Sequence, residues 1–174
     1  MDSQVQNKKY SWQNYEFLVL TSGVVIFFDQ LTKYLVRTQL ALEETWVPWP
    51  WVDRFGRIVH WKNETSAFNW LSWNRWIFVL IAILFTLAII YYFPRIPKHD
   101  WTFRLSMGLL LGGIIGNNLI DRPIFGYVTD FIMIGYGNVF NLADVSNFAG
   151  LIILCVGYLL EERKKKSEIN GSET

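Results

Sequence analysis

The sequence predicts an all-α membrane protein with four transmembrane helices and a small β-rich cap on the extracytoplasmic side. Three observations support this fold class. Apolar residues are gathered in four long stretches, and a helix that spans a bilayer needs about 20 mostly apolar residues. Trp and Tyr, which are enriched at membrane–water interfaces, number 9 and 8 among 174 residues. Finally, Lys and Arg are distributed unevenly between the two sets of connecting segments.

The four predicted spans cover residues 16–36, 76–93, 103–120 and 140–160. The second contains no charged residue and stops before Pro94. The third and fourth are interrupted only by Arg104 and Asp144, and Asp29 and Lys33 lie within the first. Each span should be helical, because lipid-exposed backbone must satisfy its own hydrogen bonds. We expect the first span to stay uncleaved, since no small-residue cleavage site follows its apolar run.

Charge predicts the orientation of these spans. Nine Lys and Arg residues lie in the two ends of the chain and in the connection between spans two and three, against six on the other side. The positive-inside rule then places both termini in the cytoplasm. Residues 37–75, with a strand-like alternation at 57–62, are the predicted outer cap, and residues 161–174 form a polar C-terminal tail. We treat the whole chain, residues 1–174, as one integral membrane domain.

Composition excludes several classes of protein. Lys and Arg number 16 and Asp and Glu 15, so no strongly basic surface for nucleic acid is expected. The single cysteine, Cys155, permits no intrachain disulfide, and the motif of zinc metalloproteases, H-E-x-x-H, does not occur. We expect neither a metal nor a cofactor.

The predicted topology brings polar residues together near the outer surface. They come from the outer ends of three spans and from the loop between the last two: Asp29, Lys33, Asn117, Asn118, Asp121, Arg122, Asp130, Asn141 and Asp144. Ionisable residues at membrane depth are costly and indicate function by default.

Most of these residues also have a structural explanation. Asp29 and Lys33 are four residues apart on a helix and could neutralise each other. Asp121 beside Arg122 could be an ion pair or a helix terminator, and Asn141 could be a helix N-cap. Asp144 is harder to explain, because it lies inside a span with no basic residue three or four positions away.

A pair of aspartates is the chemistry that fits this layer best. Nucleophilic catalysis would need a histidine there, and a Ser146–Lys33 pair has no recognisable sequence context. Two carboxyl groups held close together cannot both ionise easily, so one keeps its proton. The ionised group can then take a proton from water while the protonated one polarises a carbonyl, which hydrolyses an amide.

Five motifs occur in one order along the chain: Asp29-Gln-Leu-Thr-Lys33, Asn63-x-x-x-Ala67-Phe68, Gly112-Gly113 with Asn118-Leu-Ile-Asp121-Arg122, Val128-Thr-Asp130-Phe131, and Phe140-Asn-Leu-Ala-Asp144. Together they resemble the lipoprotein signal peptidase (signal peptidase II) family of bacterial inner-membrane aspartyl endopeptidases. The resemblance implies that Asp130 and Asp144 are catalytic. It implies substrate-binding or supporting roles for Asp29, Lys33, Asn63, Asn118, Asp121, Arg122 and Asn141.

The resemblance also implies a substrate and a location. The substrate would be a diacylglyceryl-modified prolipoprotein, cut just before its lipidated cysteine by a monomer in the bacterial cytoplasmic membrane, near the outer leaflet. The chain departs from the family pattern at Thr65, Asn117, Val145 and Asn147. Two other functions stay open: a catalytically altered relative that only binds lipoproteins, and a polytopic transporter or proton-relay protein.

Overall fold

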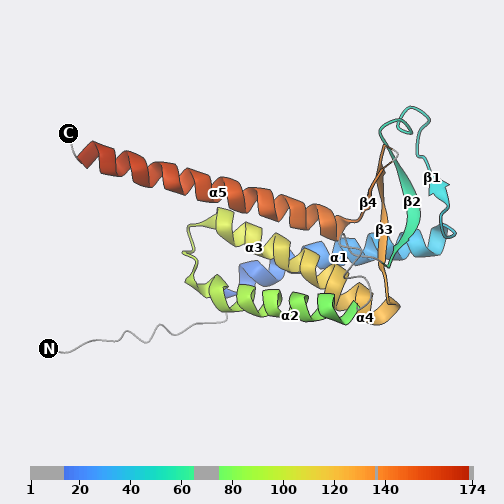
Figure 1. Ribbon diagram of the computed structural model, residues 1–174, viewed down its shortest axis with the longest axis horizontal. Coiled ribbons are helices and arrows are strands. Elements are labelled where there is room, and N and C mark those ends of the chain that lie inside the picture. Colours follow the sequence, from blue (N-terminus) through green and yellow to red (C-terminus); the bar gives the residue numbers. More distant parts are fainter. Residues whose placement is uncertain (1–13, 65–74, 136, 173–174) are drawn as a thin grey trace.

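The computed structural model describes residues 14–64, 75–135 and 137–172, which form a helical bundle with a small sheet at one end (Figure 1). Within these residues, four helices are long and apolar enough to cross a membrane: Glu16–Gln39, Arg75–Arg95, Trp101–Phe125 and Leu142–Arg163. The predicted fold class is confirmed. Thr65, Ala67 and Phe68, and the N-terminal Lys8 and Lys9, lie outside the described residues.

The helices begin and end close to the sequence signals. They are α1 (Glu16–Gln39), α2 (Arg75–Tyr92), the short η3 turn (Phe93–Arg95), α3 (Trp101–Ile114), η4 (Ile115–Asp121), α4 (Arg122–Phe125) and α5 (Leu142–Ser172). η4 is a π-helix, so the third span changes from α to π and back to α before Gly126 ends it with a φ of 85°. α5 continues as a helix through most of the polar tail.

The sheet has four antiparallel strands in the order β1 (Thr45–Trp46), β2 (Gly56–Asn63), β3 (Val128–Ile134) and β4 (Val139–Phe140) among the described residues. The sequence predicts a cap confined to residues 37–75, and the structure corrects this, because β3 and β4 come from the loop before α5. The first four residues of β3 are all buried. The strand therefore lacks the alternation of apolar and polar residues that reveals a half-buried strand.

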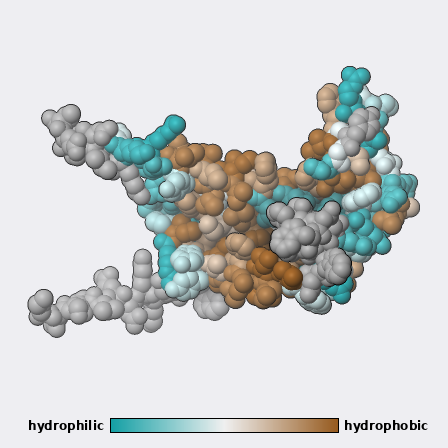
Figure 2. All heavy atoms as spheres, in the orientation of Figure 1, coloured by the Kyte–Doolittle hydropathy of each residue, from teal (hydrophilic) through white to brown (hydrophobic). Residues whose placement is uncertain are grey.

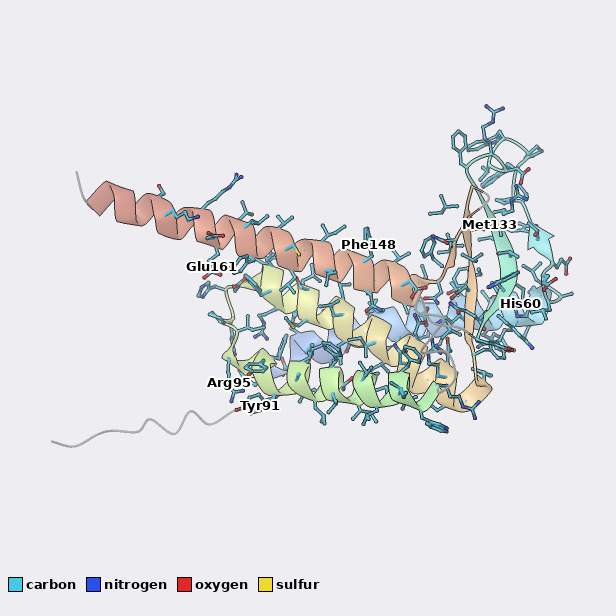
Figure 3. The ribbon with its side chains drawn as sticks, viewed as in Figure 1. His60, Tyr91, Arg95, Met133, Phe148 and Glu161 are labelled. Atoms are coloured by element: carbon cyan, nitrogen blue, oxygen red, sulfur yellow. The ribbon has the colours of Figure 1, made fainter. Side chains whose placement is uncertain are left out.

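The surface of the bundle is apolar between two polar ends. Figure 2 shows a hydrophobic band over the helices, with hydrophilic residues at the sheet and at the opposite end. Tyr91, Arg95 and Glu161 lie at the end away from the sheet, whereas His60 and Met133 lie on the sheet (Figure 3). The start of α1 and the end of α5 are also at the end away from the sheet (Figure 1).

Two glycines let α3 pack closely against both α1 and α5. A Cβ atom on Gly112 would lie 2.6 Å from the Cβ of Val25, and one on Gly113 would lie 2.5 Å from the carbonyl oxygen of Ala143. Small residues at such crossings allow backbones to approach in membrane helices. The third span therefore sits between the first and the fourth, and its π segment faces the beginning of α5.

Candidate active site

The N-terminus of α5 fixes the positions of Asn141 and Asp144. The side chain of Asn141 accepts a hydrogen bond from the backbone N–H of Asp144 at 2.9 Å, and the Asp144 carboxylate accepts one from the backbone N–H of Asn141 at 3.2 Å. This reciprocal pair is a capping box, with Asn141 at the N-cap and Asp144 three residues on. The N-cap expected for Asn141 is present, and it also orients Asp144.

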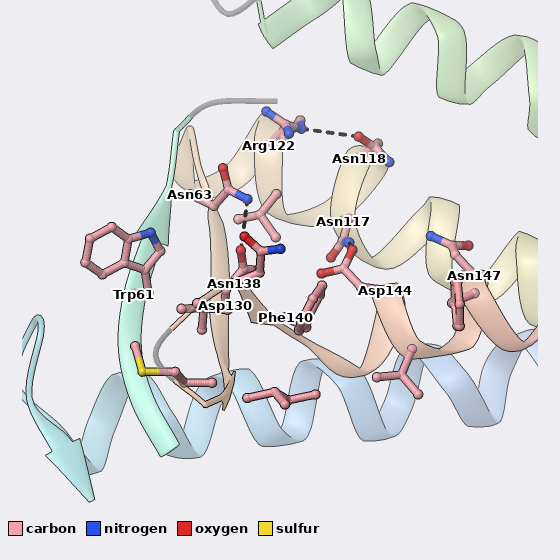
Figure 4. Close-up of a pocket in the computed structure, with 17 residues that line it drawn as sticks. Trp61, Asn63, Asn117, Asn118, Arg122, Asp130, Asn138, Phe140, Asp144 and Asn147 are labelled. Carbon is pink, nitrogen blue, oxygen red and sulfur yellow. Dashed lines mark hydrogen bonds between the residues drawn. The ribbon is translucent and has the colours of Figure 1, made fainter. Parts of the chain in front are cut away.

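Asp130 reaches the same place from the sheet (Figure 4). It lies on β3, and its two oxygens accept hydrogen bonds from the side-chain amides of Asn141, at 2.6 Å, and Asn63 of β2, at 2.9 Å. Asn141 therefore contacts both Asp130 and Asp144. We call Asp130 and Asp144 the aspartate pair.

The surroundings of Asp130 favour its protonated form. Its pKa is raised from the ordinary 3.8 to about 7. Burial is the largest cause, the neighbouring Asp144 carboxylate is the second, and the hydrogen bonds from Asn63 and Asn141 act in the opposite direction. A carboxyl group with such a pKa can serve as either acid or base near neutral pH.

A second group of polar residues surrounds Lys33, which is fully buried. Its ammonium lies 2.7 Å from Asp29 and 2.6 Å from Asp121, and it donates to the side-chain oxygen of Asn117 at 2.6 Å. Gln30 donates to both carboxylates, at 3.1 and 3.0 Å. We call these five residues the lysine cluster. The predicted pairing of Asp29 with Lys33 is present, and Asp121 pairs with the same ammonium.

Two contacts join the lysine cluster to α5. Asp29 accepts a hydrogen bond from the backbone N–H of Ala143 at 2.9 Å, and Asn117 donates to Asp144 at 2.7 Å. The first satisfies one of the free N–H groups at the start of a helix. The lysine cluster therefore holds the start of α5, which carries Asp144.

Asn118 and Arg122 lie beside the aspartate pair on the third span. The guanidinium of Arg122 donates to the side-chain oxygen of Asn118 at 3.2 Å and stacks 4.7 Å from the ring centre of Phe78. Both residues line a cavity of about 1000 Å³ that also exposes Asp130 and Asp144. A cavity of this size is at the upper end of those that bind small ligands.

The walls of this cavity are mixed. Polar groups line part of it, and so do apolar side chains from the sheet and from α5: Trp61, Val128, Met133, Ile134, Val139, Phe140, Val145 and Phe148. Three positions where the sequence departs from the family pattern, Asn117, Val145 and Asn147, line it. The cavity therefore offers apolar surface next to two carboxyl groups.

All nine site residues that the sequence predicts lie at this end of the bundle. Gln30 is not among them, and Asn117 is predicted to lie in the polar layer without a role of its own. Nothing in the local pattern around Gln30 indicates that it bridges two carboxylates. For Asn117, the sequence shows only two neighbouring asparagines, at 117 and 118. Which of them contacts α5 depends on the π-helix in which both lie, and a π-helix depends on tertiary packing.

Solved structures with this fold come from bacterial membranes. One described as a bacterial membrane enzyme, determined by the in meso method at 2.3 Å resolution, matches with a TM-score of 0.77 and 30% identity, covering 85% of this chain and 90% of that one. A second, at 1.9 Å, matches with a TM-score of 0.74 and 31% identity, covering 82% and 92%. The fold defines a multi-pass bacterial membrane protein of the same class.

The profile of the family described as signal peptidase (SPase) II matches residues 21–160. The lipoprotein signal peptidase of Moorella thermoacetica is 38% identical over 142 residues, which cover 82% of this chain and 92% of the relative. That of Bacillus subtilis is 36% identical over 149 residues, covering 83% and 94%. This chain belongs to the signal peptidase II family.

Proposed function

We propose that this protein is an aspartyl endopeptidase that removes the signal peptide from diacylglyceryl-modified prolipoproteins, cutting before the lipidated cysteine. The observation that carries the proposal is the aspartate pair, whose members come from β3 and α5, are bridged by Asn141 and line a cavity. Family membership supports the peptidase activity, and the names of the relatives support a lipoprotein substrate.

In the proposed reaction Asp144 is the base and Asp130 the acid. Asp144 takes a proton from a water molecule as the water oxygen attacks the scissile carbonyl carbon, and Asp130 gives its proton to the carbonyl oxygen. Asp144 then protonates the amide nitrogen, the C–N bond breaks, and Asp130 regains its proton from the intermediate. The raised pKa of Asp130 supports this assignment. One water is consumed, and the two carboxyl groups supply acid and base without a metal or cofactor.

We infer that the remaining site residues position the substrate or the pair. Asn63 and Asn141 orient Asp130 through their amides, and Asp29, Lys33 and Asp121 support the start of α5. Asn118 and Arg122 line the cavity, where their side-chain N–H groups can donate hydrogen bonds to a backbone carbonyl or an ester oxygen of the substrate. Each group in this scheme comes from one chain, so we propose that a monomer is sufficient.

The proposed orientation puts the sheet and the cavity at the outer leaflet of the cytoplasmic membrane and both termini in the cytoplasm. The distribution of Lys and Arg supports it. The two acyl chains of the substrate would then stay in the bilayer while its peptide enters the cavity. Such anchoring holds the scissile bond close to the aspartate pair and so reduces the entropic cost of positioning it for attack by water.

A gel-shift cleavage assay tests this function. Purified protein in detergent is incubated with a prolipoprotein that carries the diacylglyceryl group and, in parallel, with the same precursor lacking it. We expect cleavage of the lipidated precursor alone. Equal cleavage of both would contradict the substrate assignment. Binding without cleavage by a folded protein would instead favour the alternative of a relative that only binds lipoproteins.

A further inference from the structure

Asn117 lies between Lys33 and Asp144 and takes no part in the proton transfers of the proposed reaction. Its side-chain oxygen accepts from the ammonium of Lys33 at 2.6 Å, and its side-chain nitrogen donates to Asp144 at 2.7 Å. An ammonium can only donate, so the amide oxygen must face Lys33 and the NH₂ must face the carboxylate. The orientation of this amide is therefore fixed by its partners.

The π-helix separates Asn117 from its neighbour. The backbone N–H of Arg122 donates to the carbonyl of Asn117, five residues earlier. Both residues line the cavity, but Asn117 is 7% exposed and contacts Lys33 of α1 and Asp144 of α5, whereas Asn118 contacts Arg122. Single-turn π segments within α-helices are frequent at functional sites.

Asp144 depends on two donors for its orientation. Its Oδ1 accepts from Asn117 and its Oδ2 from the backbone N–H of Asn141. The second contact belongs to the helix cap, so it follows from the fold of α5 itself. The contact with Asn117 instead joins Asp144 to the buried positive charge of Lys33, because hydrogen bonds in series polarise one another in a low-dielectric interior.

We propose that Asn117 is a positioning residue that fixes the Asp144 carboxylate and couples it to the charge of Lys33. This inference rests on the proposed role of Asp144 as the base. A fixed carboxylate matters because a small misplacement of a reacting group costs a large part of the rate.

Two substitutions separate positioning from packing. Asn117→Ala removes both contacts of the amide, and we expect kcat to fall by about 10-fold to 100-fold with KM within about twofold of the parent. Asn117→Asp keeps the size and the acceptor for Lys33 but loses the donor to Asp144 when its carboxyl is ionised. When protonated, the carboxyl regains an O–H donor.

The pH dependence of these variants is the readout that a packing role would not change. The charged groups around position 117 are Lys33 and Asp29 of α1, Asp121 and Arg122 of the third span, Asp130 of β3 and Asp144 of α5. We expect the kcat of Asn117→Asp, relative to that of the parent, to be about tenfold higher near pH 6 than near pH 9. The ratio of the kcat of Asn117→Ala to that of the parent should be the same at both pH values.

Ser106→Ala is the matched control, since Ser106 is a buried polar residue of the same span but donates only to the carbonyl of Thr102. It should retain the kcat of the parent. An active parent together with an equally active Asn117→Ala variant would overturn this inference and leave the proposed function standing. A parent that binds the lipidated precursor but does not cleave it would overturn both.

Discussion

Two pairs of buried carboxylates lie within one polar layer, and they differ in what neutralises them. Asp29 and Asp121 share the ammonium of Lys33, and all three side chains are fully buried. Asp130 and Asp144 receive hydrogen bonds mainly from neutral amides, and both line the cavity. The first pair is fully buried with its counter-charge. The second lines the cavity, with Asp144 partly exposed and Asp130 2% exposed, and it has no cation within hydrogen-bonding distance among the described contacts.

This difference supports the proposal that Asp130 and Asp144 are the reacting carboxylates. A buried ion pair is costly to break, because removing either partner leaves an uncompensated buried charge. Carboxyl groups held by amides keep the capacity to gain and lose a proton, because burial and mutual repulsion leave one of them protonated. All four aspartates lie at the same end of the bundle, so membrane depth does not distinguish the two pairs. The charge of the hydrogen-bonding partner does: Asp29 and Asp121 contact an ammonium, whereas Asp130 and Asp144 contact neutral amides.

Asp130→Asn should have the largest effect on activity. The amide cannot supply a proton to the scissile carbonyl, so we expect cleavage to fall by about 10³-fold or more. The substitution also removes a carboxyl group that is unfavourable to ionise, so the unfolding temperature should stay within a few degrees of the parent. Steady-state cleavage and thermal unfolding in the same detergent measure the two effects.

Lys33→Met should have the opposite profile, with its largest effect on stability. It leaves Asp29 and Asp121 buried without their counter-charge, which should cost about 3–5 kcal/mol of unfolding free energy. Lys166→Met is the control, because Lys166 forms the same i,i+4 pair with Glu162 at 72% side-chain exposure. The loss of unfolding free energy in Lys166→Met should be much smaller than in Lys33→Met. Equal stabilities of the two variants would show that the lysine cluster does not support the fold.

Gly113→Ala tests how closely α3 must approach the start of α5. The new methyl would lie 2.5 Å from the carbonyl oxygen of Ala143, so α3 and the start of α5 must separate. We expect a loss of about 1–3 kcal/mol. Gly23→Ala is the control, since a methyl group added there on α1 would have no atom within 4 Å beyond its own stretch of helix. It should be neutral or slightly stabilising in an unfolding experiment, because alanine favours a helix.

The pH dependence of cleavage sharpens the comparison further. In the proposed reaction Asp130 is the acid, and its pKa is raised to about 7. Its proton is present below that pH and lost above it, so kcat/KM should decline as pH rises through about 7, approaching tenfold per unit. A rate that is flat between about pH 6 and pH 9 would contradict the role of Asp130 as the acid.

Local patterns in the sequence predict the spans and part of the site. The uncharged run of α2 and the Asn141-x-x-Asp144 cap are recognisable without a structure. The sharing of Lys33 by Asp29 and Asp121 is not, because a helical i,i+4 spacing predicts only the first contact. β3 and the π-helix also escape prediction. The first four residues of β3 are all buried and show no alternation, and a π turn depends on packing between α1, α3 and α5.

The most direct test of the aspartate pair is a mass measurement of the product formed from a lipidated prolipoprotein. Parent protein and Asp144→Asn are compared at equal folded concentration. Our account predicts that the parent releases a polypeptide beginning with the lipidated cysteine and that Asp144→Asn releases none. The same product from Asp144→Asn, at a rate near that of the parent, would contradict the assignment of this pair as the reacting groups.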